Sequence, residues 1–154
     1  MAPVGSYESL HAAIDAGADA VYFGVEGLNM RARSSVNFTL ADLHEIARVC
    51  AAAGVKSYLT VNTIMYDADI PVCHAVIDAA RDAGLSAIIA SDIAAILYAR
   101  SIGVEVHIST QANISNIEAV RFYAQWADVV VLARELSMDQ VAAISAAIRR
   151  DNIT

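Results

Sequence analysis

The sequence predicts an α/β fold in which short apolar strands alternate with amphipathic helices. Two observations carry this prediction. An alanine–glycine or isoleucine–glycine pair ends a helical pattern at four places, and an apolar, often β-branched segment follows each pair. These segments are 16–24, 53–62, 83–92 and 102–110, and a degenerate copy without the glycine occupies 126–134. Glycine suits a helix end because it adopts the left-handed conformation at little cost, and the apolar run suits a strand covered on both faces.

The composition limits the possible classes of protein. With 154 residues the chain has the length of one domain, and 57% apolar against 18% charged residues argues against disorder. The most apolar stretch, 88–99, is interrupted by Ser91 and Asp92, which argues against a membrane span of about 18 residues. No secretory signal is visible at the start. Cys50 and Cys73 lack metal-type spacing and indicate buried thiols, so a cytoplasmic location is expected.

The expected strands are short, and the first is a stub. They occupy 1–4, 20–25, 56–62, 87–91, 104–110 and 129–134. Because a helical pattern separates each strand from the next, the strands are expected to lie parallel, joined by helical crossovers.

Capping residues mark the starts of most of the intervening helices. A serine, threonine or aspartate stands before the helical run, and in three places a polar side chain three residues later gives capping-box spacing. The pairs are Thr39 with Asp42, Ser115 with Glu118 and Ser137 with Gln140, and the single caps are Asp69 and Asp92. A further helix is expected near 7–16.

Residue alternation decides between an open, doubly wound sheet and a (β/α)₈ barrel. In 104–111 the apolar side chains share one face, and Glu105, His107, Ser109 and Gln111 share the other; Tyr58, Thr60 and Asn62 also lie on one face. An open sheet covered by helices on both sides needs two apolar faces, whereas the inside of a barrel can become polar toward the carboxyl ends of its strands. The pattern predicts one domain over 1–154, a partial TIM-like (β/α) barrel with about six βα units of eight.

The motifs of common nucleotide-binding and hydrolytic sites are absent. The sequence has no P-loop, no GxGxxG after a strand, no GxSxG and no HExxH. The longest connection, 26–38, holds Arg31 and Arg33 beside Asn29. Two arginines in such a loop suit a carboxylate or phosphate ligand, and the alternative is a solvated surface loop.

His107 and Ser109 are the candidates for catalysis. They lie on one side of the same expected strand, where they could act as general base and nucleophile. The sequence identifies no acid that would orient His107, and the alternative is a hydrogen-bonded core histidine. Gln111, on the same side, is a candidate for substrate binding.

Other polar residues stand where strands end and are candidates for substrate binding. They are Asn62, Asp92, Arg134 and Glu135. The alternative for Asp92 is a helix cap, and the alternative for Arg134 and Glu135 is a structural ion pair. No spacing in the chain indicates a metal site.

Five segments in succession resemble the N-terminal part of the peptidase U32 family, the collagenase-like proteases. They are PVGSYESLHAAIDAGADAVYFGVEGLNMRAR at 3–33, NFTLADL at 37–43, YLTVNT at 58–63, HISTQANISN at 107–116 and VVLARELS at 130–137. The resemblance follows the family's order over essentially the whole chain. It implies a TIM-like barrel, of which this chain would be a truncated N-terminal segment.

The resemblance implies a choice between functions. Some branches of the family are prephenate-dependent hydroxylation proteins that act on the wobble uridine of tRNA or on a cytidine of ribosomal RNA, and the tRNA branch is the most similar. Another branch serves oxygen-independent hydroxylation in ubiquinone biosynthesis. The remaining alternative is the peptidase activity in the family's name.

The resemblance also implies cofactors and partners. Such members carry an iron–sulfur cluster on cysteines that follow this segment, and Cys50 and Cys73 do not match those ligands. The segment alone is therefore expected to hold no cofactor and to lack turnover. The expected partners are tRNA and a small carboxylate such as prephenate, but no membrane. Because the net charge is −7, a few arginines would have to meet the RNA. An incomplete barrel is also expected to self-associate through its open edges.

Overall fold

The computed structural model describes residues 1–26 and 38–153, and the strands within them form one parallel sheet. The strands are hydrogen-bonded in chain order, from β1 to β6, so each strand lies beside the one that precedes it in the sequence. Their bounds are β1 Ala2–Pro3, β2 Ala20–Phe23, β3 Lys56–Val61, β4 Ala87–Ala90, β5 Val106–Ile108 and β6 Val129–Val130. The last two are shorter than the expected strands at 104–110 and 129–134.

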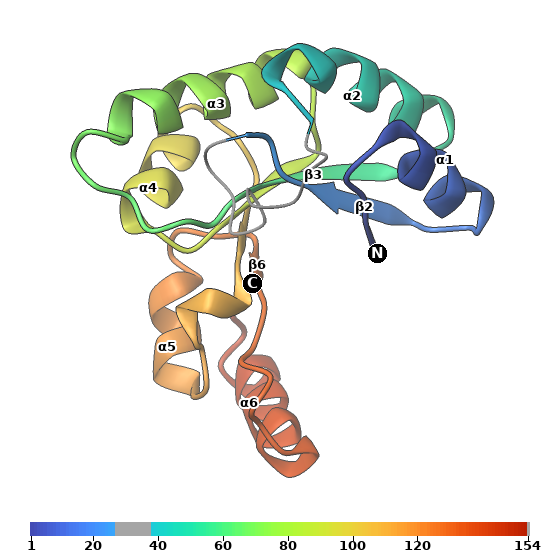
Figure 1. Ribbon diagram of the computed structural model, residues 1–154. Coiled ribbons are helices and arrows are strands. Elements are labelled where there is room, and N and C mark those ends of the chain that lie inside the picture. Colours follow the sequence, from blue (N-terminus) through green and yellow to red (C-terminus); the bar gives the residue numbers. More distant parts are fainter. Residues whose placement is uncertain (27–37, 154) are drawn as a thin grey trace.

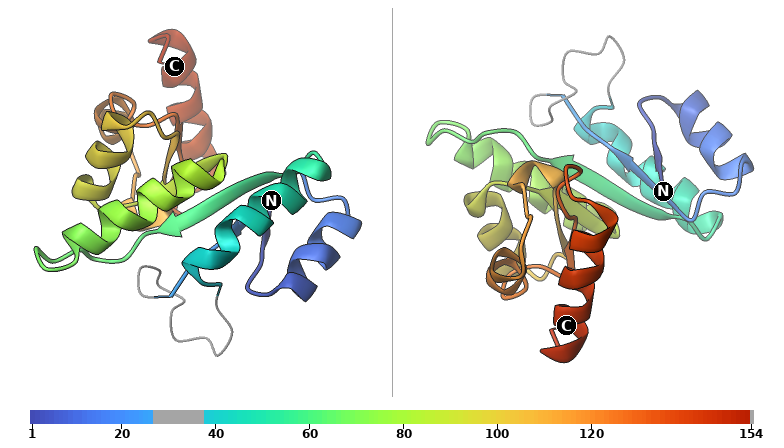
Figure 2. Two further views of the ribbon diagram at one scale, coloured as in Figure 1. Left: turned by 90° about the horizontal axis from the view of Figure 1, so that it is seen from above. Right: turned by 90° about the horizontal axis from the view of Figure 1, so that it is seen from below.

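The helices lie outside the curved sheet and follow one another around it (Figure 1). In the view from above α2 and α3 lie in front of β3, and in the view from below β3 lies in front of them (Figure 2). The helices are α1 Tyr7–Asp15, α2 Leu43–Ala52, α3 Ile70–Ala83, α4 Ile93–Ser101, α5 Ile117–Tyr123 and α6 Met138–Arg150, with short 3₁₀ turns at Leu40–Asp42 and Thr110–Ala112. Sequential strand order with one-sided crossovers is the topology of a (β/α) barrel, since a doubly wound sheet reverses its order. The predicted α/β, partial TIM-like architecture is confirmed.

The glycines that end the helical patterns have the backbone conformation that the sequence predicted. Their φ angles are +80° at Gly17, +68° at Gly54, +76° at Gly84 and +77° at Gly103. Each glycine leads directly into the next strand region. The repeated helix–glycine–strand pattern of the sequence therefore corresponds to the repeated βα unit of the fold.

Two of the expected capping-box pairs are confirmed. Ser137 donates its backbone N–H to Gln140 Oε1 at 2.8 Å, and Gln140 N–H donates back to Ser137 Oγ at 3.3 Å. Asp42 Oδ2 accepts from both the N–H and the hydroxyl of Thr39, each at 2.7 Å. The first turn there is 3₁₀, and it leads straight into α2.

Two other capping assignments were wrong. Helix α5 is capped by Asn116, whose Oδ1 accepts from Ala119 N–H at 2.9 Å, so the cap lies one residue after the expected Ser115. Asp69 does not cap α3, because its carboxylate accepts instead from Tyr66 N–H at 2.9 Å in the preceding turn.

The main hydrophobic core lies between the sheet and the helices. Alternate side chains of the strands point outward into it and are completely buried, among them Val21, Leu59, Ile88 and Val106. The other face of the sheet, here called the inner face, carries Ala20, Tyr22, Tyr58, Ala87 and Ile89 as a separate cluster. The sheet therefore has one face for helix packing and another that faces the inside of the barrel.

Side chains of β3 and β5 meet over β4 on the inner face. The rings of Tyr58 and His107 have centroids 4.7 Å apart, although β4 separates their strands. Such a contact requires a strongly curved sheet and a small residue between them, which Ala87 provides opposite Tyr58. Curvature of this kind is what closes a barrel.

Charged side chains join α5 to the end of α6. Arg121 of α5 pairs with Glu118 on its own helix and with Asp151, and Arg150 Nε donates to Asp151 Oδ1 at 2.8 Å. The hydrogen bonds from Arg150 and Arg121 lower the pKa of Asp151 from 3.8 to about 2.

Among the described helices, none is long and apolar enough to cross a membrane.

Truncation of a core side chain tests the packing of the outer face. Ile88 is fully buried between sheet and helices, whereas Ile93 at the start of α4 is 43% exposed. We expect Ile88→Ala to lower the free energy of unfolding by about 2–5 kcal/mol, because it leaves a cavity, and Ile93→Ala to change it little. Urea denaturation measures both, and equal losses would contradict this arrangement.

Replacement of Asp151 tests the α5–α6 contact. Its pKa is lower in the folded chain, so its ionised form stabilises the fold above about pH 4 and this contribution disappears as pH falls toward 2. We expect Asp151→Asn to lower the Tm near neutral pH, with the difference from the unmodified protein vanishing in acid. Circular dichroism melts measure this, with Asp67→Asn in an exposed turn as control. A difference independent of pH would refute the ion-pair explanation.

Candidate functional site

The carboxyl ends of β3, β4 and β5 bring a set of polar side chains to the inner face. The strand register places Thr60, Ile89, His107 and Val129 in one row across the sheet. Asn62, Ser91 and Ser109 each lie two residues farther along β3, β4 and β5, and together they are here called the mouth row. In open and closed α/β sheets alike, this end of the strands is where ligands bind.

His107 is a buried residue with an acidic partner. It is 8% exposed, and its Nε2 lies 2.8 Å from Glu105 Oε1. The interpretation that the sequence supplies no orienting acid was therefore wrong. Glu105 could have been found, because it precedes His107 by two residues and so points to the same face of the strand.

Ser109 is buried and accepts two hydrogen bonds. Its Oγ accepts from the backbone N–H of Gln111 at 3.3 Å, which caps the 3₁₀ turn Thr110–Ala112, and from Asn62 Nδ2 at 3.4 Å. Within the described residues, the side chains of Ser109 and His107 are not hydrogen-bonded to each other. The structure thus places both candidates on one face but engages each with a different partner, and their catalytic roles stay predictions.

Ser91 completes the mouth row and was missed by the sequence analysis. Its hydroxyl donates to the backbone carbonyl of Asn62 at 3.4 Å. The signal that could have found it is its phase, since Ser91 follows Ala87 and Ile89 at the same two-residue spacing that places Asn62 on the inner face. The mouth row therefore consists of neutral donors and acceptors linked by long hydrogen bonds.

The remaining candidates differ in their surroundings. Asp92 Oδ1 accepts from Ala94 N–H at 2.9 Å, so it caps α4 as its alternative reading predicted. Gln111, Arg134 and Glu135 are exposed. They follow β5 and β6 in the chain, and their part in substrate binding stays a prediction.

Asn29, Arg31 and Arg33 lie outside the described residues. The segment that contains them is flanked by Val25 and Phe38, which form a parallel bridge, and Glu26 N–H donates to Phe38 carbonyl at 3.2 Å. Both flanks thus lie next to the carboxyl end of β2, at the same edge of the sheet as the mouth row.

The cysteines are buried in helices, and burial raises the pKa of both thiols. For Cys73 the pKa rises to about 11, chiefly by burial and secondarily by the negative charge of Asp92. A protonated, buried thiol is a poor metal ligand and a poor nucleophile. Over the described ranges 1–26 and 38–153, histidine, cysteine and acidic residues form no group of three suited to a metal ion.

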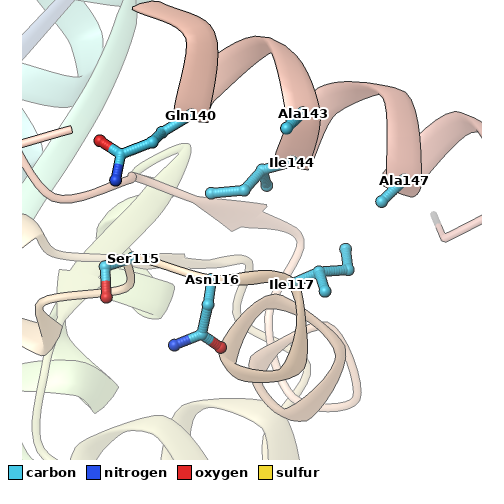
Figure 3. A pocket seen from close by; sticks show the side chains of 7 residues that line it. All are labelled: Ser115, Asn116, Ile117, Gln140, Ala143, Ile144 and Ala147. Atoms are coloured by element: carbon cyan, nitrogen blue, oxygen red, sulfur yellow. The ribbon is translucent and has the colours of Figure 1, made fainter. Parts of the chain in front are cut away.

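A cavity of about 260 Å³ lies between α5 and α6 (Figure 3). Its walls are mostly aliphatic, and it belongs to the helical layer rather than to the inner face of the sheet. The lining residues are Ser115, Asn116, Ile117, Gln140, Ala143, Ile144 and Ala147.

The sequence matches the model of peptidase family U32 over residues 5–152. Collagenase of Porphyromonas gingivalis is 70% identical over 153 residues, which cover 99% of this chain and 37% of that protein. tRNA hydroxylation protein P1 of Bacillus subtilis is 36% identical over 89% of this chain and 33% of its own length. The 23S rRNA 5-hydroxycytidine C2501 synthase of Escherichia coli is 35% identical over 83% of this chain and 19% of its own length. The chain thus spans between 19% and 37% of these relatives.

Solved structures share the fold. The U32 peptidase Mk0906 aligns with a TM-score of 0.75 at 16% identity, over 94% of this chain and 63% of the other. Deoxyribose phosphate aldolase from Aeropyrum pernix aligns with a TM-score of 0.65 at 14% identity, over 91% of this chain and 59% of the other. At these identities the likeness concerns architecture alone, and it agrees with a partial TIM-like barrel.

The state of Cys73 gives a test by chemical labelling. Because its thiol is buried and its pKa is raised to about 11, we expect very slow alkylation by iodoacetamide at about pH 8 in the folded protein and rapid alkylation in urea. Peptide mass spectrometry separates Cys73 from other cysteines. Native labelling as fast as labelling in urea would show that the α3 core is open.

Proposed function

This chain belongs to peptidase family U32, and we propose that it forms the N-terminal barrel part of an RNA-hydroxylating protein, with the wobble uridine of tRNA as the favoured substrate. The single observation that carries the proposal is the composition of the inner face. A neutral polar mouth row lies above a buried histidine, while the candidate nucleophile and the candidate base are engaged separately. This arrangement suits binding and orientation of a substrate better than attack on a peptide bond.

The mouth row offers the chemistry for recognising a base or a hydroxyl group. Asn62 brings an amide, which both donates and accepts, and Ser91 and Ser109 bring hydroxyls. Because Ser109 is only 4% exposed, a group bound there would be shielded from water. A partly dry site strengthens each hydrogen bond to the substrate.

Arginines that follow two of the strands in the sequence would bind anions. Arg134 is exposed after β6, and Arg31 and Arg33 belong to the segment that follows β2. Guanidinium groups bind carboxylates and phosphates in a bidentate manner, so this edge would meet a small carboxylate such as prephenate or the RNA backbone. Because the chain has a net charge of −7, an RNA partner would have to be bound by a few arginines.

The described residues do not fit an iron–sulfur cluster. Cys50 and Cys73 lie in separate helices, are buried, and have thiols with raised pKa values. We propose that any cluster is held by cysteines of the full-length protein outside this chain, and we assign this segment the tasks of binding and orienting the substrate.

Relatives support the proposal and also supply its rival. Proteins at 35–36% identity are named for hydroxylation of tRNA or ribosomal RNA, whereas the protein at 70% identity is named Collagenase. A peptidase would need an activated nucleophile, for which Ser109 is the candidate on the inner face. Its hydroxyl accepts from Gln111 N–H and Asn62, and the Nε2 of His107 bonds to Glu105 instead. The geometry therefore favours hydroxylation.

Analysis of nucleosides from cells that lack the full-length gene tests the proposal. We expect loss of 5-hydroxylated uridine from tRNA and its return on complementation. We expect Asn62→Ala to restore roughly 2- to 10-fold less modification, because one hydrogen bond to the substrate is lost. Gln125→Ala, which changes an exposed amide after α5, is the matched control and should restore the full level.

The rival function has its own assay. Purified full-length protein is incubated with gelatin, and the same assay is repeated with Ser109→Ala. Unchanged tRNA and ribosomal RNA in the deletion strain, together with cleavage that Ser109→Ala abolishes, would replace the hydroxylation proposal by the peptidase.

A further inference from the structure

We propose that Glu105 is a positioning residue for His107: it fixes the proton of the ring on Nε2 and leaves Nδ1 as the nitrogen available inside the barrel. The functional part of this inference rests on the proposed function, since it takes the inner face to be the site. The structural part, a fixed tautomer, does not depend on which reaction the protein performs.

Contacts on both sides fix the orientation of the ring. Glu105 Oε1 lies 2.8 Å from Nε2, and the ring of Tyr58 packs against the imidazole at 4.7 Å with the two planes inclined by 55°. The side chain of His107 is 10% exposed. A ring held in this way has little freedom to flip and exchange the positions of its two nitrogens.

The hydrogen-bonding capacity of a carboxylate determines the tautomer. An ionised carboxylate only accepts hydrogen bonds, so the nitrogen that faces Glu105 must carry a hydrogen. In the neutral imidazole the other nitrogen, Nδ1, then carries the lone pair. Among the described residues no hydrogen bond to Nδ1 is present, so this nitrogen can accept a proton or a hydrogen bond from a bound group.

The other neighbours of His107 in the sheet leave Glu105 as the group that determines where the ring carries its proton. In register with it lie Ile89 of β4 and Val129 of β6, which are apolar, and Thr60 of β3 gives its hydroxyl hydrogen to the carbonyl of Phe23 at 2.8 Å. Among the residues that the structure describes, the titratable groups in contact with the ring are Glu105 and Tyr58. Of these, Glu105 alone is hydrogen-bonded to it.

Glu105 acts through His107 rather than on a substrate. It precedes His107 by two residues and Ser109 by four, which is about 7 and 13 Å along an extended strand. Glu105 thus lies at the end of β5 remote from the mouth row, and its side chain is 44% exposed. A substrate that enters at the mouth row would meet His107 first.

Nitrogen spectroscopy of the full-length protein tests the tautomer. In long-range ¹H–¹⁵N spectra of ¹⁵N-histidine-labelled protein, at a pH well above the titration of free imidazole, we expect His107 to show a single form with the proton on Nε2. Glu105→Gln keeps the size of the side chain, but an amide can either accept or donate. Glu105→Ala has no acceptor at all. In both variants we expect the Nδ1–H form to appear. Glu118→Gln, which alters an exposed acidic partner of Arg121 on α5, should leave the spectrum unchanged.

Activity separates this inference from the proposed function. In complemented cells we expect Glu105→Gln and Glu105→Ala to lower the modified nucleoside on the order of 10-fold, because the reactive nitrogen is no longer fixed, with normal Tm values. A pure Nε2–H form in both variants, or an Nδ1–H form in the unmodified protein, would overturn the inference. If the gene deletion leaves RNA unchanged while the tautomer responds as expected, the proposed function fails and the positioning role of Glu105 remains.

Discussion

The structure depends on a single constraint: the described helices that connect successive strands all lie on the same side of the sheet. Strand order therefore equals chain order, and all the helices pack against one face. The outer face must be apolar because it is covered, and the completely buried Val21, Leu59, Ile88 and Val106 satisfy this requirement. The inner face is not covered by the described helices and need not be apolar. For this reason serine, threonine, asparagine and histidine occur on strands that lie in the middle of the fold.

Most of the fold could be predicted because its signals are local. Glycine at a positive φ angle and capping pairs such as Ser137 with Gln140 act within a few residues, so the sequence reveals them directly. The errors arise where two local solutions compete. Asparagine is as good a helix cap as serine, and α5 begins after Asn116 rather than after Ser115. Likewise Asp69 found a partner in its own turn instead of the helix.

The sequence predicted which face of the sheet carries the candidate site, but not the contacts that cross from one strand to another. Alternation along 104–111 correctly placed His107 and Ser109 together on the inner face. The pairing of His107 with Glu105 lies within one strand and could have been predicted from the same alternation. The contacts of Tyr58 with His107 and of Asn62 with Ser109 cross a whole strand, so they depend on how far the sheet curves. Curvature is a property of the assembled sheet, and no single segment encodes it.

The meeting of β3 and β5 above β4 sets the depth of the interior. In TIM barrels, each layer of interior side chains comes from alternate strands. Tyr58 and His107 belong to such a set, with Ala87 leaving room between them. By the strand register, Tyr58 lies two residues before the row that holds His107, and the tilt of the strands in a barrel brings the two rings into one layer. The rings of Tyr58 and His107 therefore fill the interior directly below the mouth row of Asn62, Ser91 and Ser109, so a group bound at the mouth row would rest on this pair of rings.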